Sequence, residues 1–418
     1  MLNAAKEREL AYLVIVDAIE PIEGKDRVEA AVVGGWRTMV RKNLFKPGDI
    51  GIYIEIDSKT PETKPFEFLE KYHYKVKTQK FKSFYSQGLL MHPSDFGWKE
   101  NKAIDPDNLG KYIEDDKGEL HYADNESRFL TKQLGITYAV VEDNKRKAPS
   151  EDKYKKMAQR RPELFKKNWA RWMMKREWGK KVMFFLFGKA KDKRSGWPAW
   201  VVKTDEERVQ NMPWVFSNED WHDYEWIATE KIDGTSTTFT LKKAKFGKTD
   251  YFVCSRNVCF DTPEKAEHCF YGSNVYLEMS QKYNVRTVLE YIMKKENLDF
   301  VTLQGETYGD GIQKRTYGLT NGEHRLMAFN LIYGYSDGVT RRLNPCEMTN
   351  ELAEFGIPCV PIIAEVYKLP IDCDTLLIQA TDKSALDGEM REGIVFRDRK
   401  GERSFKAVSN EFLARFHG

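Results

Sequence analysis

The chain has 418 residues, of which 41% are hydrophobic and 31% charged, with a net charge of only +3. This length and composition predict two packed domains with a polar surface and exclude a largely disordered chain. No apolar run approaches the roughly 20 residues of a membrane-spanning helix, and the charged start MLNAAKEREL is unlike a secretory signal. We therefore expect a cytoplasmic monomer without membrane contact, with six reduced cysteines outside any CxxC pair and no zinc site.

The first part of the chain has the pattern of short strands. Apolar, β-branched stretches fall at 11–22, 28–41, 49–57 and 86–92, and EGKD and KPGD turns separate them. Their number and length predict a small β-barrel of the OB type over residues 1–98, a fold that commonly binds single strands or duplex backbones.

Lysines and aromatic residues alternate between the third and fourth of these stretches. Lys75, Lys77, Lys80 and Lys82 are interleaved with Val76, Phe81, Phe84 and Tyr85. Such a mixture suits phosphate and base contacts, but it equally suits a solvated hairpin with one buried face. We hold the two interpretations equal.

Residues 99–195 are expected to connect two domains. The first half is polar and weakly periodic, whereas residues 145–194 contain 19 Lys and Arg against 5 Asp and Glu. Phe165, Trp169, Trp172 and Met173 recur there at helical spacing, which predicts an amphipathic helix. For one helix a buried aromatic stripe is the simpler interpretation, but the concentrated positive charge favours a nucleic-acid surface.

From residue 196 to the end, strand-like and helix-like stretches alternate. Strand patterns occur at 225–233, 235–244, 251–257, 300–309, 326–335 and 393–398, and helical patterns at 285–297 and 346–356. This arrangement predicts an α+β domain with largely antiparallel sheets.

The stretch ATEKIDGT at 228–235 carries the strongest chemical signal. Lys231 ends an apolar strand between the carboxylates Glu230 and Asp233, and Gly234 follows in a turn. A nucleophilic lysine must lose its proton, which burial or a nearby cation promotes, and glycine lets the backbone approach a phosphate. Taken alone, the tetrapeptide KIDG is weak evidence, and by itself it would be interpreted as a surface salt-bridge cluster.

Five further motifs follow in a fixed order. They are SRN at 255–257, LQGETYGD at 303–310, LMAFNLI at 326–332, REGIVFR at 391–397 and SFKAVSN at 404–410. With EKIDG at 230–234, they resemble the covalent nucleotidyltransferase superfamily of ATP-dependent ligases and capping enzymes. PIEGKDRVE, GWRTMVRK, KPGDIGIYIEID, SQGLL and KTDEERVQN extend the resemblance to the Deinococcus-type RNA ligase family, in which an OB module precedes the nucleotidyltransferase domain.

The resemblance implies an adenylyltransferase domain with ATP-grasp-like antiparallel sheets at 196–418 and a role for each motif residue. Lys231 is the expected nucleophile, and ATP with Mg²⁺ or Mn²⁺ the expected cofactors. Nucleotide contacts are expected from Glu230, Asp233, Gly234, Ser236, Arg256, Glu306, Phe329 and Lys406, and metal contacts from Asp233, Glu306 and Glu392. Without the resemblance, Phe329 would be read as core, and Arg256 and Glu306 as surface ion-pair residues.

The last motif departs from many relatives. Ser404 stands where they carry the first of two lysines, which puts in doubt how the α-phosphate is neutralised; Lys314 or Arg315 are speculative substitutes. Only 12 residues follow Lys406, so we expect the OB module at the N-terminus and none after the last motif.

The sequence therefore favours an ATP-dependent RNA ligase that seals 3′-hydroxyl and 5′-phosphate ends in nicked, RNA-containing duplexes, through a lysyl-AMP and a 5′-adenylylated strand. Two alternatives remain open. One is a nucleotidyltransferase with another acceptor or donor, namely a DNA or hybrid ligase or a GTP-using capping enzyme. The other is a nucleic-acid-binding protein that has lost catalysis, for which Ser404 is the support.

Overall fold

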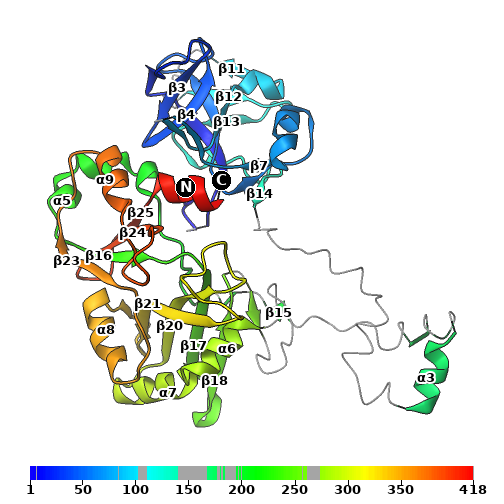
Figure 1. Cartoon of the computed structure of the whole chain (residues 1–418), viewed down its shortest axis with the longest axis vertical. Coiled ribbons are helices and arrows are strands. Elements are labelled where there is room, and N and C mark those ends of the chain that lie inside the picture. The colour runs from blue at the N-terminus through cyan, green and yellow to red at the C-terminus, as the bar shows by residue number, and fades with distance from the viewer. Residues whose placement is uncertain are drawn as a thin grey trace.

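A β domain lies on top of a larger α+β domain, and both chain ends lie at their junction (Figure 1). The computed structural model describes residues 1–5, 7–82, 84–101, 111–139, 167–176, 179, 182–183, 194–195, 197–198, 200–256, 258–260 and 274–417. Most of the basic segment 145–194, together with Asn257 of the SRN motif and Cys269, lies outside these residues.

The N-terminal domain is built from short antiparallel strands, as expected for an OB-type barrel. They are β1 (Ala11–Ile15), β2 (Ala18–Pro21), β3 (Val28–Val33), β4 (Trp36–Arg41), β5 (Ile50–Ile54), β6 (Ser58–Lys59), β7 (Lys75–Val76), β8 (Gln79–Phe81), β9 (Phe84–Ser86), β10 (Leu89–Met91), β11 (Lys99–Asn101), β12 (Tyr112–Glu114), β13 (Leu120–Tyr122) and β14 (Thr137–Tyr138). The 3₁₀ helices η1 (Lys64–Tyr72), η2 (Pro93–Phe96) and η3 (Glu126–Arg128) join them.

Burial explains the apolar sequence of the central strand of this domain. β5 is apolar throughout because it pairs with β1 on one side and β10 on the other and is buried along its whole length. Ile113, Leu130 and Ile136 pack in the same core as Leu13 and Ile52. Residues 111–139, which we expected in a connector, therefore extend the N-terminal domain in the structure.

The α+β domain contains two antiparallel sheets. Its strands are β16 (Trp226–Lys231), β17 (Thr235–Lys243), β18 (Thr249–Cys254), β19 (Cys259–Phe260), β20 (Phe300–Gly309), β21 (His324–Gly334), β22 (Thr340–Arg342), β23 (Ile362–Tyr367), β24 (Gly393–Arg397) and β25 (Ser404–Val408), and β15 (Arg194–Ser195) pairs with β19. The helical elements are η4 (Val209–Asn211), η5 (Pro213–Phe216), α5 (Glu219–His222), η6 (Lys245–Gly247), α6 (Val275–Lys282), α7 (Val285–Lys295), α8 (Pro345–Ala353), α9 (Cys373–Ala380), α10 (Asn410–Phe412) and η8 (Leu413–His417).

Each sheet has its own hydrophobic core. The larger one, ordered β15-β19-β18-β17-β20-β21-β22, packs on α6 and α7, and α7 buries Val285, Val288, Leu289, Ile292 and Met293 at helical spacing. The smaller one, ordered β23-β16-β24-β25, packs on α9 around Trp226, Phe396 and Phe405. The predicted α+β class with antiparallel sheets is confirmed.

The described part of the basic segment includes the helix α3 (Asn168–Met174), far to the right in Figure 1. Trp169 and Trp172 on it are 49% and 50% exposed, and the guanidinium of Arg176 lies 3.8 Å from the centre of the Trp172 ring. A buried aromatic stripe would require these two tryptophans to be core residues, and they are not.

No helix in the described ranges is long and apolar enough to cross a membrane. Among the described cysteines, Cys254 and Cys259 are buried and Cys346, Cys359 and Cys373 are half-buried free thiols.

Polar side chains of residues 205–211 join the two domains. Arg208 donates to Asp57 at 3.1 Å, and Asn211 donates to Glu55 at 2.9 Å while accepting from Trp36 at 2.6 Å. At the other end of the chain, Leu413 packs into the core of the N-terminal domain. The relative placement of the two domains therefore depends on polar side chains that hydrogen-bond across the junction.

Glu55 is the centre of this junction and is only 1% exposed. Burial alone would raise the pKa of its carboxyl, but the Met1 amino group, Arg8 and a hydrogen bond from Asn211 lower that pKa to about 2. An acid with a lowered folded pKa stabilises the fold above its unfolded value, near 4.5, and loses this contribution as the pH falls toward 2.

We expect Glu55→Gln to lower the free energy of unfolding by about 3 to 5 kcal/mol at pH 7, because a buried cation cluster loses its counter-charge. Urea unfolding at pH 7 and pH 3 measures this, and the difference from wild type should shrink at pH 3. The control is Glu20→Gln, which removes a half-exposed ion pair with Arg37 and should cost less than about 1 kcal/mol. An equal loss at both pH values would contradict the assigned role of the charge.

Candidate functional site

A cavity of about 770 Å³ lies between the two domains, and we call it the central cavity. The N-terminal domain contributes Arg8, Asp57 and Tyr138, and the segment after it contributes Thr204, Asp205 and Arg208. The α+β domain contributes Glu230, Lys231, Asp233, Gly234, Ser236, Arg256, Glu306, Phe329, Glu392, Arg397, Lys406 and His417. Every residue expected to bind nucleotide or metal therefore lines one cavity, although the sequence spreads them over 177 positions.

Lys231 ends β16 at the floor of this cavity. Its Nζ lies 2.7 Å from Oε2 of Glu392, which precedes the neighbouring strand β24. Burial alone would lower the pKa of Lys231, but the charges of Glu392, Glu306 and Asp233 outweigh burial and raise it. These carboxylates therefore favour the protonated form of the lysine, and neutralising them would favour the free amine.

Gly234 follows in the turn, where a side chain would not fit. A Cβ at this position would lie 2.4 Å from the carbonyl oxygen of Thr307 and 3.0 Å from Cγ of Glu306. The glycine thus lets the loop after Lys231 pack directly on β20, which brings Asp233 and Glu306 toward the same space.

Three carboxylates, those of Asp233, Glu306 and Glu392, line the cavity near Lys231. Asp233 is 5% exposed, and its Oδ2 has no hydrogen-bond partner within the described chain. Burial and the neighbouring charges of Glu392 and Asp233 raise the pKa of Glu306 to about 8, and burial raises that of Glu392. Crowded carboxylates with a buried orphan oxygen have the donor chemistry that Mg²⁺ and Mn²⁺ require.

Phe329, on β21, provides an aromatic wall of the cavity. The guanidinium of Arg397 lies 6.0 Å from the centre of its ring, and Nε and Nη1 of Arg397 have no partner within the described residues. Glu230 also lines the cavity, but its carboxylate already accepts hydrogen bonds from Ser384 and from the amide of Ala385. A planar ligand lying against this wall would contact the ring of Phe329 and the polar atoms of Arg397.

Arg256 and Lys406 converge on one acid that the sequence analysis did not single out. Arg256 contacts both carboxylate oxygens of Asp205 at 2.7 Å, and Nζ of Lys406 lies 4.0 Å from Asp205. Burial and the neighbouring Arg8 lower the pKa of Lys406 to about 7. An anionic ligand entering here would meet a cationic cluster held in place by Asp205.

The structure also shows what surrounds Ser404 and its suggested substitutes. Ser404 hydrogen-bonds to Glu206, and so does Arg397 at 3.1 Å. Arg315 instead pairs with Asp387 at 2.7 Å and does not line the central cavity, so it cannot replace the missing lysine there. Arg8 and Arg208, which sequence reasoning missed, line the cavity and bring positive charge from the junction.

Ser236 lies on β17 directly opposite Glu306 on β20. Its hydroxyl is 2.8 Å from that of Thr204 in the KTDEERVQN segment. Ser236 therefore lines the central cavity together with the other residues expected to contact the nucleotide.

The four lysines of the N-terminal domain do not converge. Lys75 and Lys77 line a second, small cavity that shares Asp57, Gln313 and His417 with the central cavity, and Lys314 lines it from the other domain. Lys80 and Lys82 lie instead on the hairpin β8–β9, where Lys80 sits 5.1 Å from the ring of Tyr85. The structure therefore separates them into a pair at the small cavity and a pair with exposed side chains on the hairpin.

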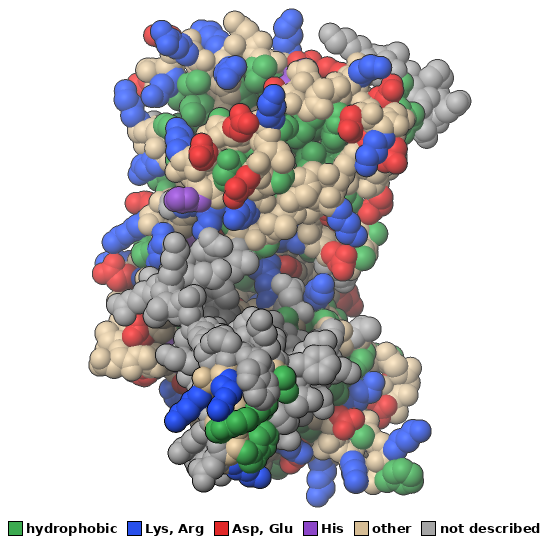
Figure 2. Space-filling view, turned by 90° about the vertical axis from the view of Figure 1, so that its right-hand side faces the viewer, with side chains coloured by type: hydrophobic (Ala, Val, Ile, Leu, Met, Phe, Trp, Pro, Cys, Tyr) green, Lys and Arg blue, Asp and Glu red, His purple; other side chains and the backbone are tan. Residues whose placement is uncertain are grey.

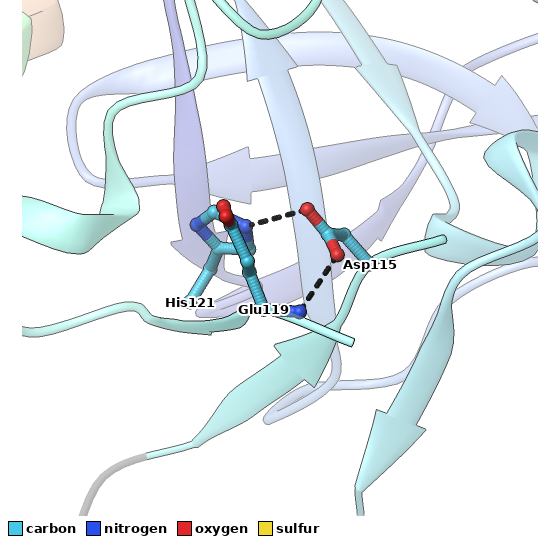
Figure 3. A group of neighbouring side chains, drawn as sticks. All are labelled: Asp115, Glu119 and His121. Atoms are coloured by element: carbon cyan, nitrogen blue, oxygen red, sulfur yellow. Dashed lines mark hydrogen bonds and ion pairs between the residues drawn. The ribbon is translucent and has the colours of Figure 1, made fainter. Parts of the chain in front are cut away.

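Another group with metal-binding residue types lies in the N-terminal domain, at the hairpin of β12 and β13 (Figure 3). Ligand atoms of Asp115, Glu119 and His121 lie within 4.8 Å of one another. Asp115 accepts from the amides of Lys117 and Glu119 at 2.8 Å and lies 3.3 Å from the imidazole of His121. These hydrogen bonds account for the arrangement, which is a folded turn in the described structure.

Two protein-family models match segments of the chain. Residues 224–408 match the RNA ligase family model, and residues 10–93 match an OB-fold domain model. Comparison with curated proteins gives no match.

Several solved structures of Naegleria gruberi RNA ligase have the same fold. A mutant with ATP and Mn is 22% identical, with a TM-score of 0.67 over 98% of this chain and 100% of that chain. The enzyme with PPi is 23% identical, with a TM-score of 0.67 over 98% and 99% of the two chains. A mutant with AMP and Mn is 22% identical with the same TM-score and coverage. At this identity the likeness establishes a shared fold over nearly the whole chain.

Proposed function

We propose that this chain, whose residues 224–408 match the RNA ligase family model, is an ATP-dependent RNA ligase that forms a covalent AMP adduct on Lys231 and then seals RNA ends. The observation that carries this proposal is the placement of Lys231. Its amine lies at 2.7 Å from Glu392 in a cavity that also holds an aromatic wall, three carboxylates and a cationic cluster.

In the first step the Lys231 amine attacks the α-phosphorus of ATP. A P–N bond forms, the bond from that phosphorus to the bridging oxygen breaks, pyrophosphate leaves with its electron pair, and the amine gives up a proton. Phe329 would stack on the base. Arg256 and Lys406, which contact the Asp205 carboxylate in the structure, would contact the ribose or the phosphate of the bound nucleotide.

Asp233, Glu306 and Glu392 would hold a divalent cation beside the nucleophile. Such a cation supplies positive charge that offsets both the carboxylates and the phosphate. Because these carboxylates raise the pKa of Lys231, offsetting them frees the amine for attack.

In the later steps a 5′-phosphate oxygen of the polynucleotide attacks the phosphorus of the lysyl-AMP, and the P–N bond breaks so that Lys231 is regenerated. The 3′-hydroxyl of the adjoining end then attacks the activated 5′-phosphorus, and AMP leaves. The substrate we propose is a nicked duplex with RNA on the 3′-hydroxyl side.

The first test is incubation of the purified protein with ATP or GTP and Mg²⁺ or Mn²⁺, followed by intact-mass analysis and peptide mapping. We expect an AMP adduct on Lys231 from ATP. A GMP adduct instead would indicate capping chemistry, and sealing of a panel of nicked duplexes with RNA or DNA at each end would separate an RNA ligase from a DNA ligase. Absence of any adduct, with retained binding of nicked RNA, would contradict the enzymatic proposal.

The polynucleotide is proposed to approach the central cavity along Lys75 and Lys77. On the face shown in Figure 2, Lys and Arg side chains are intermingled with Asp and Glu over the described surface, so this face offers no single basic field. Lysines beside the cavity are therefore better candidates for phosphate contacts than the general surface charge.

We expect Lys75→Ala combined with Lys77→Ala to weaken binding of a nicked RNA duplex about 10-fold at low salt, and to reduce the slope of log affinity against log salt by about 1 to 2. Binding titrations at several salt concentrations measure both. The pair Lys80→Ala and Lys82→Ala tests the hairpin separately, and Lys245→Ala with Lys248→Ala at the β17–β18 turn serves as a charge-matched control. An unchanged salt slope in the first pair would rule out phosphate contacts there.

A further inference from the structure

Asp233 is held from two sides by residues outside the recognised motifs. Its backbone amide donates to the hydroxyl of Tyr317 at 2.7 Å, and Nε2 of His417 lies 3.4 Å from its Oδ1. The other oxygen, Oδ2, is buried in the central cavity without a partner among the described residues. One oxygen is thus engaged by an imidazole, and the second is left for a ligand.

We propose that His417 is a positioning residue for lysine adenylation, which fixes the carboxylate of Asp233 so that Oδ2 faces the cation site beside Lys231. This inference rests on the proposed function, because it assigns Asp233 to the cation. His417 itself touches Asp233 and not the reacting atoms, so it acts through that carboxylate.

The fold delivers the imidazole to this place through several anchors on residues 410–417. Asn410 accepts from Gln87 of the N-terminal domain at 2.6 Å, Leu413 is buried in the core of that domain, and Phe412 is fully buried. The ring of Phe412 packs against Phe416 and His417, with centroids 4.6 and 5.8 Å away. A side chain fixed in this way orients its partner with little loss of entropy on binding.

Tyr317 holds the backbone of Asp233. Its backbone adopts a φ of +54°, a left-handed conformation that is costly for a tyrosine and is retained where the surrounding structure requires it. The guanidinium of Arg315, itself bound to Asp387, lies 4.3 Å from the centre of the Tyr317 ring. The backbone of Asp233 is therefore fixed by Tyr317 and its side chain by His417.

An alternative role for His417 is contact with the polynucleotide, since it also lines the small cavity with Lys75, Lys77 and Lys314. The two roles differ in the step that they affect. A positioning residue alters metal binding and adenylation in the absence of RNA, whereas a polynucleotide contact alters only the later steps.

Two measurements test this inference. Electron paramagnetic resonance of the free ion measures Mn²⁺ binding without nucleotide, and adenylation rates are measured over a range of Mn²⁺ concentrations. We expect His417→Ala to weaken Mn²⁺ binding about 10-fold or more, as removal of an orienting outer partner typically does, and to slow adenylation at low Mn²⁺ with recovery at high Mn²⁺. His417→Asn, which keeps an N–H donor, should restore part of the affinity, and Tyr317→Phe should weaken binding in the same direction.

The matched control is His324→Ala, which removes another half-buried histidine, paired with Glu278 at 2.9 Å and outside both cavities. It should bind Mn²⁺ and form adduct as wild type does, and thermal melting identifies any variant that fails to fold. Wild-type Mn²⁺ affinity and adenylation in His417→Ala would overturn the inference, and so would a defect confined to sealing of RNA. Failure of the wild type to form any adduct would instead refute the proposed function itself.

Discussion

Lys231→Ala is expected to abolish the AMP adduct and strand sealing, lowering the rate of adenylation by on the order of 10⁴-fold or more, because no other amine replaces the attacking group. In the structure Lys231 ends β16 beside the carboxylates, whereas Lys406 lies on β25 against Asp205. Intact-mass analysis after incubation with ATP and Mn²⁺ measures the adduct directly.

Two companion variants separate chemistry from folding. Lys231→Arg keeps a cation opposite Glu392 but provides a guanidinium that is a poor nucleophile, so it should melt like wild type and form no adduct. Lys203→Ala removes another lysine that lines the central cavity and is 41% exposed, and it should retain the adduct. An undiminished adduct in Lys231→Ala would show that another residue is the nucleophile.

Glu392→Gln is expected to change two properties of the site in opposite directions. Adenylation should fall by about 100-fold or more. The substitution removes one of the three carboxylates proposed to hold the cation, and the preorganised electrostatic contact of that carboxylate is lost as well. At the same time the pKa of Lys231 should fall, because the nearest charge that raises it is removed. A larger fraction of the amine is then deprotonated at neutral pH in the absence of metal.

These outcomes are measured by the rate of AMP adduct formation and by labelling of Lys231 with an amine-reactive reagent, read by peptide mass. Labelling should become faster in Glu392→Gln while adenylation becomes slower. Asp299→Asn, which removes a half-exposed ion pair with Lys243, is the control and should alter neither. Slower labelling together with slower adenylation would mean that Glu392 does not hold Lys231 protonated.

The motif residues could be located in the sequence because they lie on or beside strands that the sequence itself marks. Lys231, Glu306 and Lys406 all lie on strands with clear apolar patterns, and the order of the six motifs links them to a shared chemistry. Asp205 lies in KTDEERVQN, which was noted as a resemblance, but nothing in its spacing indicates that it neutralises Arg256. Its role depends on a contact between residues 51 positions apart.

Tyr317 and His417 could not be found from the sequence for a related reason. Neither belongs to a motif, and each reaches Asp233 through packing: one from a loop with left-handed backbone and one from a segment anchored in the N-terminal domain. Similarly, residues 111–139 read as a polar connector because their few apolar side chains, such as Ile113 and Leu130, are too sparse to show periodicity. They become core only against strands from elsewhere in the chain.

The sequence by itself determined the strands and helices around the motifs and the order of the two domains, and it predicted a set of site residues that line one cavity, since these depend on local periodicity and residue type. Only the tertiary structure decided which charges meet. Asp205 opposes Arg256 and Lys406, Arg315 pairs with Asp387, and His417 reaches Asp233. Ion pairs and buried orphan oxygens depend on distances of a few ångströms between distant segments, and those distances follow from the packing of two domains against each other.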